Sequence, residues 1–331
     1  MTVQEQLRHR AAELLTDGTI DLFVGYAASD APLKAAVHVA RTAADAEMLT
    51  WNAFCAPNVA ALLPDLLRRP DGAGEDWAPQ RVGILAKGCV SRSIVGLIKA
   101  HQIPREAVHV IGVGCDGVVD RHRAARLFTP AAILDAEPLD GDRMLLRGTD
   151  GAERTVDLAE ILLGSCLDCQ HRNAVLADET IGDPVPETGP GPQEDAATSF
   201  AARPIDERWE AFEEEISRCI RCYACREACP NCYCTECFAE ETEPHWIGVT
   251  TDPSDLMLFH LGRAFHQAGR CVDCGACVAA CPMGIDLRLL THKVNRDVEA
   301  LFGGEASVSL DIVEPLLQFE MTDDEGFITE P

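Results

Sequence analysis

Two spacings of hydrophobic residues alternate along residues 20–127. Short runs rich in Val, Ile and Leu are separated by segments whose apolar residues recur at helical intervals. The short runs predict β-strands, and the segments between them predict helices. Strands are expected at residues 20–27, 35–40, 81–86 and 107–113, and helices at residues 58–69 and 91–101. Alternation of this kind is typical of an α/β layered fold.

The flanks of this region carry further signals. Near the N-terminus, Leu7 and Leu14 share one face of a short amphipathic helix, which is expected to end at Gly18. Residues 143–157 have the pattern of a β-hairpin with its turn at residues 149–151. These elements assign residues 1–182 to one α/β domain.

The composition of the chain changes after residue 182. Residues 183–204 are rich in proline, glycine and acidic side chains, which is typical of a linker. Residues 306–331 are expected to form an acidic C-terminal tail. Between these two segments, residues 205–305 form a separate unit.

The spacing of apolar residues in this unit is helical. Helices are expected at residues 205–218, 254–268 and 287–301. The second begins with Ser254, a residue type that is favoured at the N-cap.

One internal repeat dominates the unit. The spacing C-x2-C-x2-C-x3-C-P occurs at residues 219–230 and again at residues 271–282. This is the bacterial ferredoxin spacing for a 4Fe–4S cluster, because thiolates two residues apart wrap a tight loop around one cubane. In two-cluster proteins the fourth cysteine of each run binds the other cluster. The spacing therefore assigns one cluster to Cys219, Cys222, Cys225 and Cys281, and the second to Cys271, Cys274, Cys277 and Cys229.

Zinc and disulfide bonds are the alternative uses of these thiols. Zinc sites usually pair two short C-x2-C knuckles and do not contain two copies of the longer run. The spacer between the two runs is long and helix-rich, which favours an α-helical ferredoxin over the compact β-rich form. The expected fold is therefore an α/β N-terminal domain followed by an α-helical dicluster ferredoxin module.

The net charge of the chain and the targeting signals it lacks indicate which partners and which compartment to expect. Among 331 residues, 54 acidic and 28 basic side chains give a formal net charge of −26, which disfavours nucleic acid and anionic membrane surfaces. No signal-peptide pattern or membrane-spanning apolar run is present, so we expect a cytoplasmic location and no membrane insertion. Thiols stay reduced in that compartment, so the 16 cysteines indicate metal binding rather than disulfides.

Four of the cysteines outside the ferredoxin runs suggest a further site. Cys166 and Cys169 form a ligand-like pair, and Cys89 and Cys115 each come just after a predicted strand. Parallel strands end at one edge of a sheet, so these thiols are expected to converge there.

The remaining cysteines are less informative. Cys232, Cys234 and Cys237 offer another ligand-like group, whereas Cys55 alone is expected to be a small buried hydrophobe. One or two further 4Fe–4S clusters are therefore expected, and spacing does not decide which cysteines share them.

A glycine motif also invites a nucleotide interpretation. Gly112, Gly114 and Gly117 follow a predicted strand and formally match a dinucleotide-binding fingerprint. Asp116, however, would place a carboxylate where the pyrophosphate should lie. We favour the alternative that the glycines let the backbone approach a cluster or flavin closely.

Two cations lie at another predicted strand-to-helix junction. Lys87 and Arg92 flank Gly88 and Cys89, and cations together with helix N-terminal amides suit an anionic cofactor. Taken alone, these two side chains are more simply interpreted as solvated charges.

Several stretches together resemble a known family. "WNAFCAPN", "AKGCVSRSIVGLIK", "IGVGCDG" and "CLDCQHRNAVLADETIGD" are similar to the β-subunit family of deazaflavin-dependent (coenzyme F420-type) hydrogenases and formate dehydrogenases. The two cysteine runs resemble the dicluster branch of that family, which is associated with heterodisulfide-reductase-like complexes. The resemblance implies a flavin, usually FAD, beside a cluster in a flavin-type N-terminal domain. It makes the following residues candidates for the flavin or nucleotide site: Lys87, Gly88, Arg92, His171, Arg172 and Asn173.

These observations predict an electron-transfer subunit of a cytoplasmic oxidoreductase complex. By the resemblance, it moves electrons between a two-electron carrier, NAD(P)H or deazaflavin, or a formate- or hydrogen-oxidising subunit, and a heterodisulfide-reductase-like partner. A flavin can accept two electrons and pass them on singly. The alternatives are a flavin-free relay or assembly subunit and an iron–sulfur redox sensor.

Overall fold

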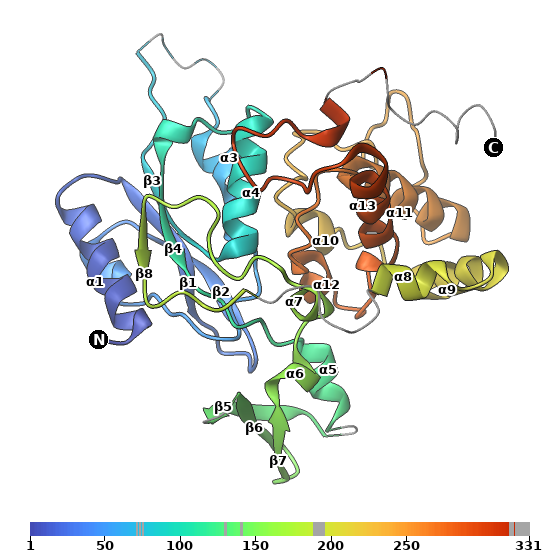
Figure 1. Cartoon of the computed structure of the whole chain (residues 1–331), viewed down its shortest axis with the longest axis horizontal. Coiled ribbons are helices and arrows are strands. Elements are labelled where there is room, and N and C mark those ends of the chain that lie inside the picture. The colour runs from blue at the N-terminus through green and yellow to red at the C-terminus, as the bar shows by residue number, and fades with distance from the viewer. Residues whose placement is uncertain are drawn as a thin grey trace.

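The computed structural model describes residues 1–70, 72, 74, 76–128, 131–139, 142–187, 196–317 and 321. A five-stranded sheet forms the centre of the N-terminal half (Figure 1), with strand order β2-β1-β3-β4-β8. Its strands are β1 (Leu22–Ala28), β2 (Ala35–Ala40), β3 (Val82–Ala86), β4 (Val108–Val113) and β8 (Glu179–Ile181). Only β2 runs antiparallel to its neighbour. The α/β class is therefore confirmed.

The four strands predicted from short apolar runs are all present in this sheet, and β8 is the strand of this sheet that was not predicted. The central strand β3 is buried along its whole length, as expected for a parallel strand covered on both faces. β8 has only three residues and begins with Glu179, so its sequence carries no strand signal. Pairing with β4 makes it a strand.

Helices cover both faces of this sheet. α1 (Val3–Thr16) lies on one face and α4 (Gly88–Lys99) on the other. Leu7 and Leu14 of α1 are fully buried or nearly so, and Thr2 and Glu5 close its N-terminus as a capping box. The predicted face of this helix and its end near Gly18 are confirmed.

Two predicted helices have different bounds in the structure. The segment predicted as one helix at residues 58–69 divides into a 3-10 turn, Val59–Leu62, and the short helix α3, Leu63–Leu67. Pro64 lies in the first turn of α3, and because proline has no backbone N–H it interrupts the hydrogen-bond ladder between the two segments. α4 begins at Gly88, three residues before the predicted start, directly after β3.

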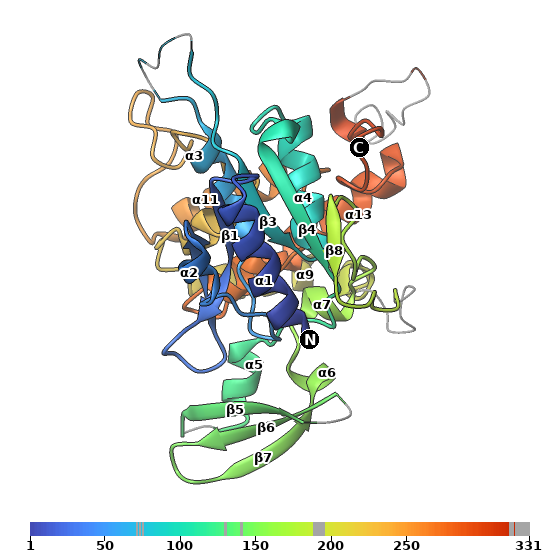
Figure 2. The same cartoon turned by 90° about the vertical axis from the view of Figure 1, so that its left-hand side faces the viewer.

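A second, three-stranded antiparallel sheet projects from the N-terminal half (Figure 2), built from β5 (Ile133–Leu139), β6 (Arg143–Gly148) and β7 (Glu153–Asp157). β6 and β7 confirm the predicted hairpin. β5 was not predicted because it contains Pro138 and alternating acidic residues. Arg147 on β6 forms ion pairs with carboxylates on both neighbouring strands.

The C-terminal half is helical around the two cysteine runs. Its main helices are α9 (Ile205–Ser217), α10 (Ala224–Glu227), α11 (Pro253–Gln267), α12 (Ala276–Ala280) and α13 (Arg288–Phe302). The predicted helices at residues 205–218, 254–268 and 287–301 are confirmed within two residues. Ser254 is not the N-cap of α11, however. That position belongs to Asp252, because Pro253 occupies the first helical position.

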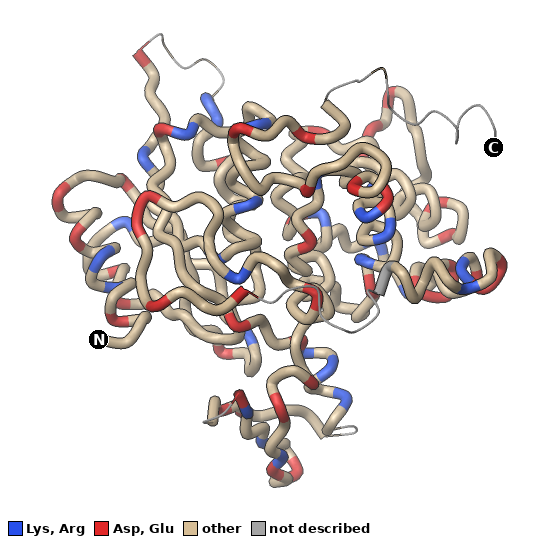
Figure 3. The backbone as a smooth tube through the Cα atoms, viewed as in Figure 1, with Lys and Arg blue, Asp and Glu red and all other residues tan. Residues whose placement is uncertain are grey.

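Shorter elements connect these parts: α2 (Ala43–Ala46), η2 (Arg105–Ala107), α5 (Arg121–Arg126), α6 (Leu158–Ile161), α7 (Gly164–Leu167), α8 (Ala196–Ala201) and η3 (Pro315–Leu317). No helix in the described ranges is both long and apolar enough to cross a membrane. Acidic residues are distributed along both halves of the chain, and α9 carries several of them (Figure 3).

The segments predicted as linker and tail are described in part. Residues 188–195 of the linker and residues 318–320 and 322–331 of the tail lie outside the described residues. The first part of the tail packs against α4: Arg92 donates to the Ala306 carbonyl at 2.6 Å, and Lys99 forms an ion pair with Glu314 at 3.1 Å.

The start of α4 is packed tightly against the loop that follows α7. A Cβ atom built on Gly88 would lie 1.8 Å from the carbonyl oxygen of His171. We therefore expect Gly88→Ala to push the two segments apart and to lower the free energy of unfolding by about 1–3 kcal/mol, measured by anaerobic denaturation. Gly74→Ala is the control, because among the described residues, its chain neighbours apart, no atom lies within 4 Å of its added Cβ. Equal stability of the two variants would contradict this packing.

Candidate metal centres

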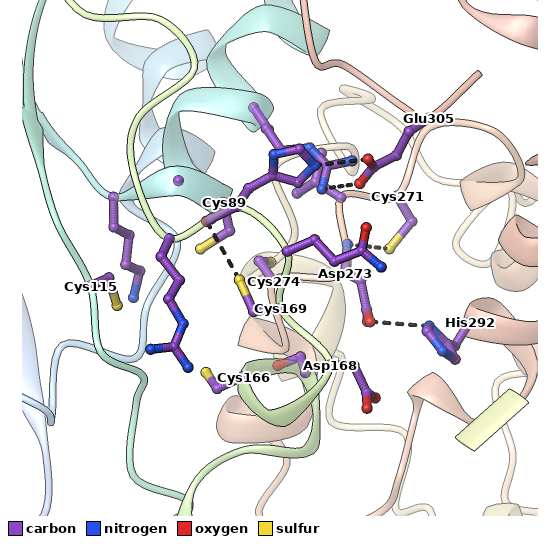
Figure 4. A pocket seen from close by; sticks show the side chains of 18 of the residues that line it. Cys89, Cys115, Cys166, Asp168, Cys169, Cys271, Asp273, Cys274, His292 and Glu305 are labelled. Atoms are coloured by element: carbon purple, nitrogen blue, oxygen red, sulfur yellow. Dashed lines mark hydrogen bonds and ion pairs between the residues drawn. The ribbon is translucent and has the colours of Figure 1, made fainter. Parts of the chain in front are cut away.

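A cavity of about 220 Å³ lies where the N-terminal half meets the second cysteine run. Cysteines from both halves of the chain line it (Figure 4): Cys89, Cys115, Cys166, Cys169, Cys271 and Cys274. The cavity thus contains all four thiols that were predicted to converge at the sheet edge.

The parallel sheet explains this convergence. β3 and β4 end side by side, so that Cys89, just inside α4, and Cys115, two residues after β4, lie at the same edge. Cys166 on α7 accepts a hydrogen bond from the Val118 amide at 3.3 Å, and the Cys169 thiol donates to the His171 carbonyl at 3.4 Å. Burial raises the pKa of the Cys89 and Cys166 thiols, the latter to about 11.

The cations at the strand-to-helix junction are not solvated, so that simpler interpretation was wrong. Lys87 is 3% and Arg92 is 6% exposed. Lys87 donates to the Cys55 carbonyl and lies over the Tyr26 ring. Burial alone would lower the pKa of Lys87, but the negative forms of Tyr26 and nearby cysteines hold it above its ordinary value. Lys87 therefore brings a buried positive charge to the wall of the cavity.

Glu305 pairs with two basic side chains at the cavity. Arg92 Nη1 lies 2.7 Å from Glu305 Oε1, and His171 Nε2 lies 2.8 Å from Glu305 Oε2. Glu305 also lines the cavity. The sequence analysis missed it because it lies far from the motifs along the chain and follows a helix with no ligand-like spacing.

The six residues implied by the resemblance are not all placed alike. Lys87, Gly88, Arg92, His171 and Arg172 line the cavity. Asn173 does not appear in its lining, and its side chain donates to the Val185 carbonyl at 2.7 Å and to Glu187 at 2.8 Å.

The glycine motif at residues 112–117 serves packing within the chain. A Cβ on Gly112 would lie 3.0 Å from Ala174 Cβ, and one on Gly114 would lie 2.7 Å from a Val185 methyl. The next helix, α5, begins only at Arg121, so no helix N-terminus follows as a dinucleotide fingerprint requires. Gly117 lines the cavity, so the preferred alternative, close approach of the backbone to a cofactor, stays a prediction there, but it has no support at Gly112 and Gly114. Their neighbours are protein atoms.

One buried polar atom in this cavity fits an anionic group. Ser165 Oγ has no hydrogen-bond partner among the described residues, and Ser165 lines the cavity. A buried polar group without a partner is costly, and a hydroxyl can donate to the sulfur of a cluster. The cavity is smaller than the roughly 300–1,000 Å³ that organic ligands usually occupy. The thiols, the buried cation and the size together fit a compact iron–sulfur cluster.

The two ferredoxin-type runs adopt the same backbone conformation. Arg221 and Tyr223 in the first run, and Asp273 and Gly275 in the second, have φ angles between 53° and 70°. In each run the amide two residues after the first cysteine points at its sulfur, at 3.4 Å in both. The sequence repeat is therefore also a structural repeat, with backbone N–H groups directed at thiolate positions.

The thiols of these runs group across the repeat. The Cys219 thiol lies close enough to Cys222 and Cys281 for their charges to interact. The Cys271 thiol interacts in the same way with Cys274, Cys277 and Cys229. The fourth cysteine of each run thus lies beside the first three of the other. The assignment of eight ligands to two clusters stays a prediction, and the thiols that it groups lie near one another in this structure.

The remaining cysteines have separate surroundings. Cys55 is fully buried in the core beside the sheet. Cys232 contacts the Gln267 amide, Cys234 is exposed, and Cys237 packs with Phe238 against a small core. Among the described residues, no three His, Cys, Asp or Glu side chains are placed to hold a single metal ion.

Ion pairs connect the two halves next to the cavity. Arg288 on α13 donates to Asp273 at 2.6 Å and to Asp168, after α7, at 3.1 Å. His292 Nδ1 lies 3.1 Å from Asp273. Burial alone would raise the pKa of Asp273, but Arg288 and His292 hold it below its ordinary value. The second cysteine run is therefore fixed to the N-terminal half by paired charges.

Comparisons with known proteins were made for the whole chain. No family model matches it. The F420-dependent formate dehydrogenase subunit beta of Methanocaldococcus jannaschii is 25% identical over 280 residues, covering 68% of this chain and 73% of that protein. The F420-dependent formate dehydrogenase 1 subunit beta of Methanococcus maripaludis is 25% identical over 281 residues, covering 67% and 72%.

One of the solved structures that match this chain is a hydrogenase complex. It is a xenon derivative of the F420-reducing [NiFe] hydrogenase complex from Methanosarcina barkeri, with a TM-score of 0.35 and 15% identity over 51% of this chain and 58% of that one. The resemblance expected from the motifs is confirmed by the two sequence relatives: over about two thirds of its length, this chain is similar to β subunits of F420-dependent formate dehydrogenases.

Proposed function

We propose that this chain is an iron–sulfur electron-transfer subunit of a multi-subunit oxidoreductase. In this proposal residues 205–305 form a dicluster ferredoxin module, and residues 1–182 carry one further 4Fe–4S cluster held by Cys89, Cys115, Cys166 and Cys169. The observation that supports it best is the shared cavity, where these four thiols meet Cys271 and Cys274 of the second run. Electrons can then pass between the halves over a short distance.

The protein's own residues hold and insulate the clusters. Iron–sulfur clusters supply one-electron chemistry, and their potentials depend on charge, hydrogen bonds and burial. Lys87 places a buried cation at the cavity, and the Ser165 hydroxyl is free to donate into it. The amides of Arg221 and Asp273 donate to cysteine sulfurs. These groups stabilise negative charge at the cluster positions without taking part in proton transfer.

The resemblance adds a flavin and a two-electron carrier to this proposal. FAD would accept two electrons from deazaflavin or NAD(P)H and release them singly. Arg172 and His171, at the cavity rim, are the residues proposed to bind its anionic part. A flavin-free relay is the second candidate. Glu305 already forms ion pairs with Arg92 and His171, and the cavity of about 220 Å³ is small for an organic cofactor.

The proposed partners follow from the relatives. Both are named as β subunits of formate dehydrogenases, so we propose a formate- or hydrogen-oxidising subunit on one side. A heterodisulfide-reductase-like subunit is proposed on the other. A cytoplasmic location is proposed because exposed thiols such as Cys234 and Cys222 persist in a reducing compartment.

Removing one cavity ligand tests the third cluster. In Cys166→Ala we expect the loss of about four iron atoms and four sulfides per chain, because three thiolates hold a cubane poorly. Iron and acid-labile sulfide of anaerobically purified protein are measured, with the paramagnetic signals after dithionite reduction. Cys55→Ala is the matched control, since that thiol is buried in the core outside the cavity lining. Full iron content in Cys166→Ala would exclude this assignment.

Reduction by a two-electron carrier tests the function. Anaerobically purified wild-type protein, alone and with its co-purifying subunits, is mixed with reduced deazaflavin or NADPH. We expect the visible absorbance of the clusters to bleach, and a yellow fluorescent extract after acid precipitation if flavin mediates the transfer. Bleaching without extractable flavin selects the flavin-free relay. Colourless wild-type protein without iron would refute the proposed function.

A further inference from the structure

One arginine on α11 lies between the two cysteine runs. Arg263 is 7% exposed, and its Nη2 donates to the carbonyl of Cys225 at 3.0 Å. Its guanidinium also has the thiols of Cys277, Cys225, Cys229 and Cys232 as electrostatic neighbours. Side-chain hydrogen bonds join it to Cys277 and Cys232. A single cation therefore contacts thiols that the spacing assigns to both clusters.

Arg263 has no carboxylate partner in the part of the chain that the structure describes. Its Nε has no hydrogen-bond partner there either. By contrast, Arg288 on α13 is paired with Asp273 and Asp168. A buried cation without a counter-charge is strongly unfavourable, so the partner must come from the thiolates and whatever they hold. The Nε–H group of Arg263, which has no partner among the described residues, can donate a hydrogen bond to a cluster sulfur.

We propose that Arg263 sets the reduction potentials of both clusters in the helical module, an inference that rests on the proposed cluster assignment. Its charge and N–H groups stabilise the more negative, reduced form of each cluster. Because it stands between them, it also weakens the repulsion between two reduced clusters.

The place of Arg263 between the two clusters suits a reaction in which the donor delivers two electrons. A hydride donor is oxidised by two electrons and leaves one proton in solvent, whereas each 4Fe–4S cluster accepts a single electron. Two clusters reduced at similar potentials can therefore hold both electrons of one donor. Without the intervening cation, the second reduction becomes harder than the first.

The test is a potentiometric titration of the anaerobic full-length protein, followed by electron paramagnetic resonance. For Arg263→Gln we expect the reduction equilibrium of both clusters to fall at least tenfold, which is about 59 mV for a one-electron couple. Arg263→Lys retains the charge with fewer fixed donors, so we expect a smaller fall. Arg154→Gln on β7 is the control, because it removes the same charge from the exposed three-stranded sheet.

The iron and sulfide content of each variant distinguishes a change in reduction potential from a loss of clusters. Unchanged potentials in Arg263→Gln with full iron overturn the inference and leave the proposed function standing. Wild-type protein without clusters refutes the proposed function itself. If Arg263→Gln loses clusters, Arg263→Lys decides: lowered potentials with full iron support the inference, and loss of iron there too shows that Arg263 is structural and overturns it.

Discussion

Buried charges that must be paired hold the two halves of this molecule together. Arg288 joins Asp273, inside the second cysteine run, to Asp168 after α7. On the other side of the cavity, Arg92 of α4 meets Glu305 after α13. A buried ion pair adds little net stability, but breaking it leaves an uncompensated charge, so it strongly disfavours other arrangements. These pairs specify how the helical half sits on the α/β half.

The cavity depends on this arrangement because neither half completes it alone. The sheet edge contributes Cys89 and Cys115, and the helical half contributes Cys271 and Cys274. A cluster in the cavity would be adjacent to one in the second run, and the cross-repeat grouping of thiols continues to the first run. In the proposed function, the chain is thus organised as a line of redox positions rather than as separate binding units. Exposed Cys222 of the first run lies toward its outer end.

Burial distinguishes the roles of the basic residues. The whole chain is strongly acidic, yet Lys87, Arg92 and Arg263 are buried beside cysteines. Arg92 is paired with Glu305, whereas Lys87 and Arg263 would offset the negative charge of the thiolates in the proposed clusters. Charge composition therefore describes the surface of this protein and says little about the potential inside it.

The sequence by itself determined what depends on residues close together along the chain. The cysteine repeat, the four apolar strands and the long helices were predictable, because ligand spacing and hydrophobic periodicity are local properties. Tertiary structure decided the rest. β8 is a strand only because it pairs with β4, Lys87 is buried only because the sheet and α4 enclose it, and Gly112 is needed only because Ala174 packs on it. Glu305 became part of the cavity by the same cause: burial and pairing arise between segments far apart in sequence, where no local pattern records them.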